Sequence, residues 1–159
     1  MFQIPEGAFI IDGSAPNVGA AATVVGDYIS LKNAQMAWVI FHYRQADANA
    51  ITFHVNRATA VAPTGATTLA DAVPIWSNLA TATSNTLVRR TDATSYAAGT
   101  AAGSKIIIFQ IDPATLGSTY DCIAGEASAV AAAQYLSILY VVKPKFSSKV
   151  SDQLSFITD

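Results

Sequence analysis

Two histidines, His42 and His54, are the residues of this sequence best suited to metal binding or proton transfer, because imidazole binds metals and titrates near neutral pH. They lie in two neighbouring strand-like segments and would approach each other in a hairpin. Asp47 or Asp27 would supply a carboxylate to such a site. No further ligand stands at a spacing typical of a metal centre, so we expect solvent-facing or hydrogen-bonded histidines.

Other catalytic patterns are missing from the sequence. It contains no Gly-x-Ser-x-Gly elbow, no Gly-x-x-x-x-Gly-Lys loop and no Gly-x-Gly-x-x-Gly fingerprint. The segment 47–49 resembles the start of a calcium loop but lacks the downstream Gly and Glu that calcium requires, so it predicts a turn. We therefore expect a protein that is not an enzyme and that holds no metal or cofactor.

Three further residue types have a structural interpretation. The single cysteine, Cys122, excludes an intramolecular disulfide and is expected to be buried in a strand-like segment. Asp92 follows two arginines and predicts a local ion pair at a strand end. Trp38 lies in an apolar run and is expected to be buried. Trp76, with Ser77 and Asn78 beside it, is the candidate for stacking on a sugar.

The low charge of the chain is its most informative bulk property. Asp, Glu, Lys and Arg make up 13% of its 159 residues, against about 25% in an ordinary soluble domain. A surface of small, weakly polar residues suits a protein that packs against copies of itself or a larger lattice. The net charge of −2 gives no field that would collect nucleic acid or an anionic membrane, so neither is an expected partner.

No targeting segment is recognisable in the sequence. Residues 1–7 lack the basic and apolar regions of a signal peptide, and the longest apolar run, 36–41, is far too short to span a bilayer. We therefore expect synthesis in the cytoplasm.

The hydrophobic pattern predicts an all-β fold. Segment 36–43 is apolar on both faces, as in a central strand covered on each side, and 51–55 alternates with a period of two. The polar loop between them predicts an antiparallel hairpin. The Ala-rich segment 124–134 is interpreted as a loop or hairpin. We expect an antiparallel β-sandwich or jelly-roll-like single domain, with further strands at 73–78, 86–90, 105–111, 120–123 and 135–142.

The two ends of the chain differ from this core. The pattern predicts an extended N-terminal arm (1–26), a β-sandwich core (27–142) and a C-terminal arm (143–159). Each arm carries large apolar residues that would dock on a neighbouring subunit, although both arms could instead fold back on their own domain. The expected contact residues are Phe2, Ile4, Phe9, Ile10, Phe146, Leu154, Phe156 and Ile157.

Three groups of segments give the chain a family resemblance. They are 26–34, then 73–78 with 84–92, then 105–113 with 120–122. In the residues of these segments and in their order, the chain resembles a family of small proteins encoded among the head genes of tailed bacteriophages and prophages, close to the major capsid protein gene. The resemblance covers residues from about 5 to 159.

The resemblance implies a structural virion protein. The role it suggests is capsid decoration, in which a cement protein on the capsid exterior stabilises the shell through many contacts with the major capsid protein and with itself, as a homotrimer. It would be made in the host cytoplasm. The alternative is a head-tail, tail or head-fibre component with a receptor- or glycan-binding role.

Overall fold

Strands make up nearly all the regular structure of this protein. The computed structural model describes residues 7–18, 22–130, 134–146 and 155–158, and twelve strands run through these residues. A short 3-10 turn, η1 (Pro113–Thr115), follows Asp112, whose side chain accepts a hydrogen bond from the Ala114 amide at 2.9 Å. The all-β class predicted from the sequence is confirmed.

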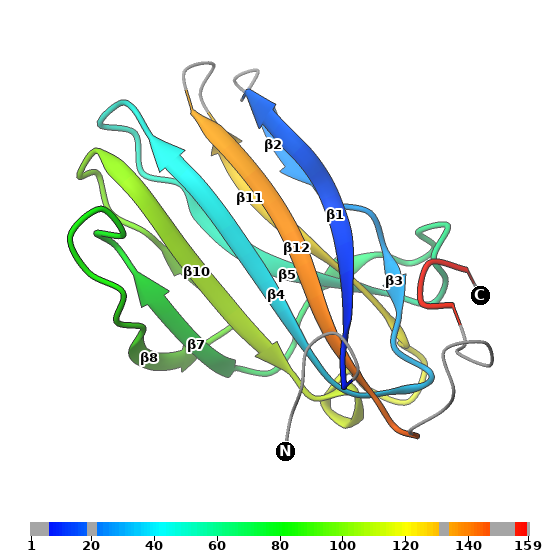
Figure 1. Ribbon diagram of the computed structural model, residues 1–159. Helices are drawn as coiled ribbons and strands as arrows, with labels where there is room; N and C mark the ends of the chain where they lie inside the picture. The colour runs from blue at the N-terminus through cyan, green and yellow to red at the C-terminus, as the bar shows by residue number, and fades with distance from the viewer. Residues whose placement is uncertain (1–6, 19–21, 131–133, 147–154, 159) are drawn as a thin grey trace.

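The larger face of the molecule is sheet A, with the strand order β1-β12-β4-β10-β7-β8 and antiparallel pairing throughout. Figure 1 shows this sheet in front, with β4 in its middle. Its strands are β1 (Phe9–Val18), β4 (Ala34–Gln45), β7 (Val73–Asn78), β8 (Val88–Ala93), β10 (Gly103–Ile111) and β12 (Tyr135–Pro144).

Sheet B lies behind sheet A and completes the sandwich (Figure 1). Strands β2, β11, β5 and β6 follow one another, while β3 pairs with β11 and β9 pairs with β5. The predicted antiparallel sandwich is thus confirmed. The strands of sheet B are β2 (Ala22–Val25), β3 (Ile29–Ser30), β5 (Thr52–Ala58), β6 (Thr67–Thr68), β9 (Ser95–Ala97) and β11 (Cys122–Val130).

The core consists of alternate side chains that both sheets point inward. Phe41 of sheet A packs on Phe53 of sheet B with ring centroids 5.0 Å apart, and on Phe109 of its own sheet at 5.8 Å. Tyr43 adds a third aromatic contact, 4.9 Å from Phe53. These rings are fully buried, so a continuous apolar layer joins the two sheets.

The expected hairpin between 36–43 and 51–55 is wrong. Strand β4 pairs with β10 and β12 in sheet A, whereas β5 pairs with β6, β9 and β11 in sheet B. The loop between them crosses from one layer to the other. A short polar loop can connect two strands of one sheet or two strands of different sheets. Here the apolar inner faces of β4 and β5 pack on each other across the core, and the two strands do not pair edge to edge.

The expected loop over 124–134 is also wrong where the structure describes it, because β11 extends through residue 130. The small residues of this strand serve close packing between the layers. A Cβ atom at Gly125 would lie 2.9 Å from both Phe41 Cζ and Val39 Cγ1, closer than carbon atoms pack. Ile123, Gly125 and Ala127 are buried with a period of two, which the sequence does not display because small residues occupy both faces of the strand.

The predicted arm boundaries differ from the structure. Residues 9–18 form an edge strand of sheet A and 22–25 form β2 of sheet B, while β12 continues past residue 142 to Pro144. Phe9, Ile11, Val24 and Phe156 of the two ends pack on the core of their own domain, whereas Ile10, Phe146 and Ile157 stay exposed. Strand β1 pairs with β12 through two register shifts, between Asp12 and Ser14 and between Ser14 and Asn17.

The described residues include no helix that is long and apolar enough to cross a membrane.

Candidate binding pocket and exposed apolar face

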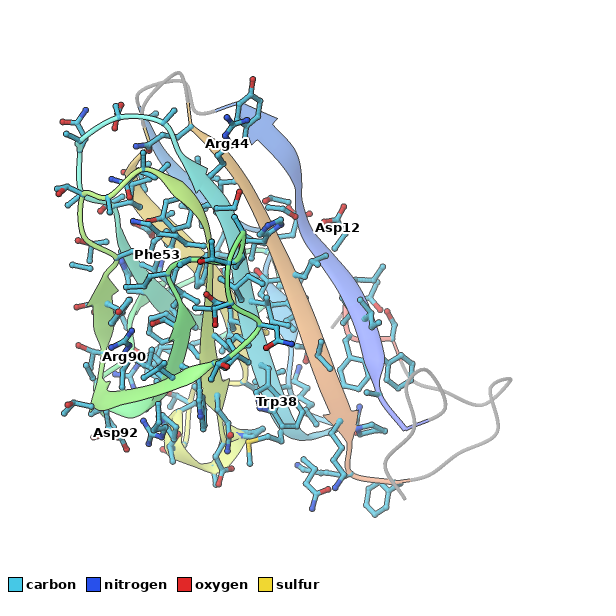
Figure 2. The ribbon with its side chains drawn as sticks, turned by 60° about the vertical axis from the view of Figure 1, so that its left-hand side comes forward. Asp12, Trp38, Arg44, Phe53, Arg90 and Asp92 are labelled. Atoms are coloured by element: carbon cyan, nitrogen blue, oxygen red, sulfur yellow. The ribbon has the colours of Figure 1, made fainter. Side chains whose placement is uncertain are left out.

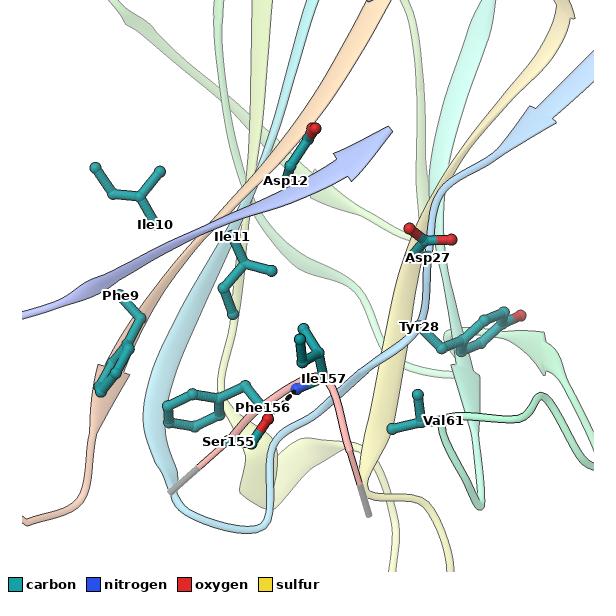
Figure 3. Close-up of a pocket in the computed structure, with 10 residues that line it drawn as sticks. All are labelled: Phe9, Ile10, Ile11, Asp12, Asp27, Tyr28, Val61, Ser155, Phe156 and Ile157. Atoms are coloured by element: carbon teal, nitrogen blue, oxygen red, sulfur yellow. Dashed lines mark hydrogen bonds between the residues drawn. The ribbon is translucent and has the colours of Figure 1, made fainter. Parts of the chain in front are cut away.

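A pocket of about 820 Å³ lies at one pole of the sandwich, where β1, the turn before β3 and the C-terminal segment 155–158 meet. Figure 3 shows its walls, with the aromatic rings of Phe9 and Phe156 on one side and the carboxylates of Asp12 and Asp27 at the opposite rim. The pocket is lined by Phe9, Ile10, Ile11, Asp12, Asp27, Tyr28, Val61, Ser155, Phe156 and Ile157.

The aromatic wall joins the two ends of the chain. The rings of Phe9 and Phe156 meet edge to face with centroids 4.9 Å apart, a geometry that the ring quadrupoles favour. The backbone amide of Ser30 donates a hydrogen bond of 2.7 Å to the Phe156 carbonyl, which holds the C-terminal segment against β3. Phe156 is thereby buried, whereas the neighbouring Ile157 stays 61% exposed.

The acidic wall is fixed from inside the sandwich by Tyr140. Its hydroxyl, on β12 of sheet A, accepts a hydrogen bond of 3.1 Å from the Gly125 amide of sheet B. The same hydroxyl donates to the Asp27 carbonyl at 2.8 Å. The Asp27 amide donates to the Gly13 carbonyl of β1 at 2.7 Å. The backbone that carries the Asp27 carboxylate is therefore tied to both layers.

Tyr28 forms the third part of the pocket wall. Burial raises the pKa of the Tyr28 hydroxyl, a hydrogen bond with Asn56 partly opposes this, and the charge of Glu126 raises the pKa further. The hydroxyl therefore stays protonated at neutral pH. With an apolar wall and two carboxylates at the rim, the pocket is suited to an apolar side chain followed by a cationic group.

The predicted contact residues come together only in part. Phe9, Ile10, Phe156 and Ile157 line the pocket, so the structure gathers four residues from opposite ends of the sequence. Phe146 is 74% exposed just after β12 and is not among the residues of this pocket. The other expected contacts, Phe2, Ile4 and Leu154, lie outside the described residues.

The outer face of sheet A is a second candidate surface, which the sequence analysis missed. One register row crosses all six strands, and its members are cross-strand neighbours in turn: Asp12, Leu139, Ile40, Ile108, Trp76 and Arg89. The four apolar members are partly exposed and the two charged ends are exposed. In Figure 1 no described segment crosses in front of this face.

The continuous apolar pattern of 36–43 was the available signal for this face. It predicted a strand covered on both sides, but only the inner side is covered within the described part of the chain. Trp38, expected to be buried, is partly exposed on the outer face, where it is paired with Val141 and Gln110. Figure 2 shows its ring near one end of β4.

The two histidines do not form a site together. His42 is exposed on the outer face of sheet A, and His54 lies on the outer face of sheet B, because their neighbours Phe41 and Phe53 point into the core between the sheets. His54 Nε2 instead lies 3.2 Å from Glu126 Oε1, and Asn56 donates a hydrogen bond to the same carboxylate. Glu126 was overlooked because its segment was interpreted as a loop.

Trp76, the candidate for stacking on a sugar, has a charged side chain over its ring. The guanidinium of Arg89 lies 4.7 Å from the centroid of the Trp76 ring and covers it. Ser77 is buried and accepts a hydrogen bond from Arg90 Nε at 2.8 Å. Asn78 is also buried and donates to the Ser84 carbonyl at 2.7 Å. Both polar neighbours therefore serve the fold.

Three minor expectations, a turn at Asp47, an ion pair at Asp92 and a buried thiol at Cys122, agree with the structure. Asp47 accepts a hydrogen bond from the Asn49 amide at 3.0 Å, which is turn chemistry. Arg89 forms the predicted ion pair with Asp92, and Cys122 is a buried thiol. Among the described residues, no group of three His, Cys, Asp or Glu side chains is placed to hold a metal ion.

Fold and site together define a two-layer antiparallel β-sandwich with a polar-rimmed apolar pocket and an apolar sheet face. No protein-family model matches the chain, and no curated protein is similar to it in sequence. The solved structures that are distantly similar include the following two, and neither is similar enough to indicate a function. The SPBc2 prophage-derived protein YomS has a TM-score of 0.46 and 10% identity over 85% of this chain and 91% of its own. A structure described as "CBM4 structure and function" has a TM-score of 0.36 and 8% identity over 89% and 74%.

Proposed function

We propose that this protein is a structural virion component that decorates and stabilises a tailed-phage capsid from the outside by binding the major capsid protein. The family resemblance of the sequence supports the setting. The low charge supports the role, because a surface with 13% charged residues can be buried without desolvating many ions. Decoration of this kind needs no catalytic residue, cofactor or metal.

The observation that carries the proposal is the gathering of Phe9, Ile10, Phe156 and Ile157 around one pocket. Ile10 and Ile157 are 58% and 61% exposed, so the pole offers apolar surface to a partner as well as a cavity. The hydrogen bonds that hold Asp27 and Phe156 make the site preorganised, which lowers the entropic cost of binding.

The mechanism is mechanical. A capsid segment with an apolar side chain enters the pocket, and a neighbouring Lys or Arg meets the carboxylates of Asp12 and Asp27. Each contact is modest, but the many copies on a shell act together, and multivalency turns modest affinities into a firm clamp. The homotrimer implied by the resemblance stays a prediction, which the mass of the free protein in solution tests.

The decisive experiment is the copy number of this protein in purified particles of the phage that encodes it, measured by quantitative mass spectrometry against the major capsid protein. A ratio near one to one is expected for a protein that covers the shell. A ratio of a few per cent would contradict decoration and favour a vertex, neck or tail position.

Substitutions at the pole test the contact surface. Ile157→Asp and Ile10→Asp place a charge on exposed positions and leave the core intact, so the protein should fold but be lost from particles. Val88→Asp is the matched control, since Val88 is 45% exposed on the far edge strand β8. Full incorporation of both pole variants would contradict the proposed contact. Deleting residues 1–11 would be a poorer test, because it removes part of β1.

The alternative role in a head-tail, tail or head-fibre position remains distinguishable. A receptor- or glycan-binding component would be present in few copies, and its partly exposed Trp76 would have to lose its Arg89 cover before stacking on a sugar. Arg89→Ala exposes that ring. The test compares the wild type and Arg89→Ala on a glycan array. Measurable binding by the wild type that increases in the variant would favour the ligand-binding role over decoration.

A further inference from the structure

We propose that two copies of this protein associate face to face through the outer surface of sheet A, around a two-fold axis that runs roughly parallel to the strands between β4 and β10. This inference goes beyond the capsid-binding role. It uses the outer face of sheet A instead of the pocket, although Asp12 belongs to both surfaces. Its readout is the mass of the free protein in solution, so it fails or holds separately from capsid binding, and it replaces the homotrimer implied by the resemblance with a two-fold pair.

The first reason is the apolar character of the face. Its centre is built from Trp38, Ile40, Ile106, Ile108, Leu139 and Val141, which are all partly exposed. A solvated face of an antiparallel sheet normally alternates to polar residues. Seven apolar side chains in adjacent rows, counting Trp76, form a contiguous patch of the kind that marks an interaction surface.

The second reason is the order of charge along the row through Ile40 and Ile108. Asp12 stands at the β1 end and Arg89 at the β8 end, with four apolar residues between them. A two-fold axis parallel to the strands exchanges the two edges of the sheet. Asp12 of each copy then lies opposite Arg89 of the second copy, and the row is complementary to itself.

The same row excludes the other face-to-face arrangement. An axis perpendicular to the strands would place β1 over β1 and β8 over β8, so that Asp12 would face Asp12 and Arg89 would face Arg89. Like charges brought together at an interface cost several kcal/mol. The charge order therefore selects one axis direction, in which Ile40 lies against Ile108 of the second copy near the dimer centre.

The third reason is area. Six strands at a spacing of about 4.8 Å are about 24 Å wide, and the six residues of β7 and of β8 are about 20 Å long at about 3.3 Å per residue. Two such faces bury on the order of 1,000 Å² in total, the lower end of what a specific interface needs. Two twisted sheets also pack readily in this aligned manner, at about −30°.

The test begins with the mass of the full chain in solution, measured by light scattering and sedimentation over a range of concentrations. The expected mass is twice the 16.6 kDa of one chain, falling toward one chain on dilution. A monomer throughout the range would overturn the proposal, and so would a trimer, because a three-fold arrangement cannot make this isologous contact.

Two sets of variants identify the surface. Ile108→Lys places a charge at the dimer centre and should give a folded monomer by circular dichroism and mass. Val25→Lys is the matched control, since Val25 is 47% exposed on a strand of sheet B, and it should stay dimeric. A dimer that survives Ile108→Lys, or is lost equally in Val25→Lys, would overturn the proposed face.

A charge exchange tests the axis and does not depend on the stability of the apolar variant. Asp12→Arg or Arg89→Asp alone should raise the dimer dissociation constant about tenfold, because the pair occurs twice in the dimer. The double variant Asp12→Arg with Arg89→Asp should recover most of the loss. If the losses of dimer affinity in the two single variants add up in the double variant, the proposed pairing of Asp12 with Arg89 is wrong.

Discussion

The hydroxyl of Tyr140 donates a hydrogen bond of 2.8 Å to the backbone carbonyl of Asp27, across the core from sheet A to the loop that carries the acidic wall of the pocket. The same hydroxyl accepts from the Gly125 amide. One buried phenol thus links the packing of the two layers to the geometry of the candidate binding pocket.

We predict that Tyr140→Phe lowers the free energy of unfolding by about 1–3 kcal/mol, because it leaves the buried Gly125 amide and the partly buried Asp27 carbonyl without their partner. Urea denaturation followed by tryptophan fluorescence measures the loss. Tyr135→Phe on the same strand is the control, because Tyr135 is 51% exposed, and it should change little. Equal effects of the two substitutions would contradict the bridging role.

Gly125→Ala should destabilise the sandwich by about 1–3 kcal/mol, because the added methyl group would lie 2.9 Å from Phe41 and Val39 and must push the layers apart. Chemical denaturation gives the magnitude. Combining it with Val39→Ala provides room for the methyl group, so the double variant should lose less than the sum of the single losses. Simple additivity would show that the layers are not in close contact there.

Alkaline titration should reveal buried tyrosines. Burial chiefly raises the pKa of Tyr43 and Tyr140 well above the usual 10.0, and also raises that of Tyr28. The folded state then retains protons that the unfolded state releases, so stability is full below pH 10 and falls as the pH rises further. Absorbance at 295 nm should show part of the tyrosinate signal appearing only on unfolding.

The tyrosinate absorbance that appears only on unfolding should come from the buried tyrosines. It should shrink in Tyr43→Phe and in Tyr140→Phe, measured separately, and stay unchanged in Tyr135→Phe. Full ionisation of all six tyrosines while the far-ultraviolet spectrum remains native would contradict the burial of Tyr28, Tyr43 and Tyr140.

The contact between His54 and Glu126 on sheet B should be stronger than the ion pair between Lys32 and Asp121 at the surface. His54 and Glu126 are only 16% and 19% exposed at their side chains, whereas Lys32 and Asp121 are 51% and 32% exposed. Double-mutant cycles with alanine should give a coupling of about 0.5–3 kcal/mol for the first pair and about 0–1 kcal/mol for the second. The reverse order would mean that Asn56 alone holds Glu126.

The sequence predicts the class of fold well because period-two burial is a local property. The strand around Phe53 is visible from alternation, and those around Ile107 and Ile138 are visible as short apolar runs. The layer in which each strand lies is not local. The short loop after β4 fits a hairpin and a crossing between layers equally, and only the packing of Phe41 on Phe53 decides between them.

The candidate sites were predictable to different degrees. The sequence predicts contacts by the apolar residues at both ends, but the meeting of Phe9 and Phe156 depends on distant strand pairing that no sequence spacing encodes. The face around Ile40 and Ile108 had a visible signal, since the segment was apolar on both sides. The prediction covered both sides of this strand with the same chain, so it did not indicate that the outer side is exposed.

The register shifts in β1 have a consequence for open-ended polymerisation. An edge strand with regular geometry offers its free backbone groups to the next molecule and can seed fibrils. Here one edge of sheet A is bulged after Asp12, and the opposite edge, β8, carries Arg89, Arg90 and Asp92. Sideways growth is therefore opposed at both edges. A concentrated solution of this apolar, weakly charged protein should remain free of amyloid-type aggregates.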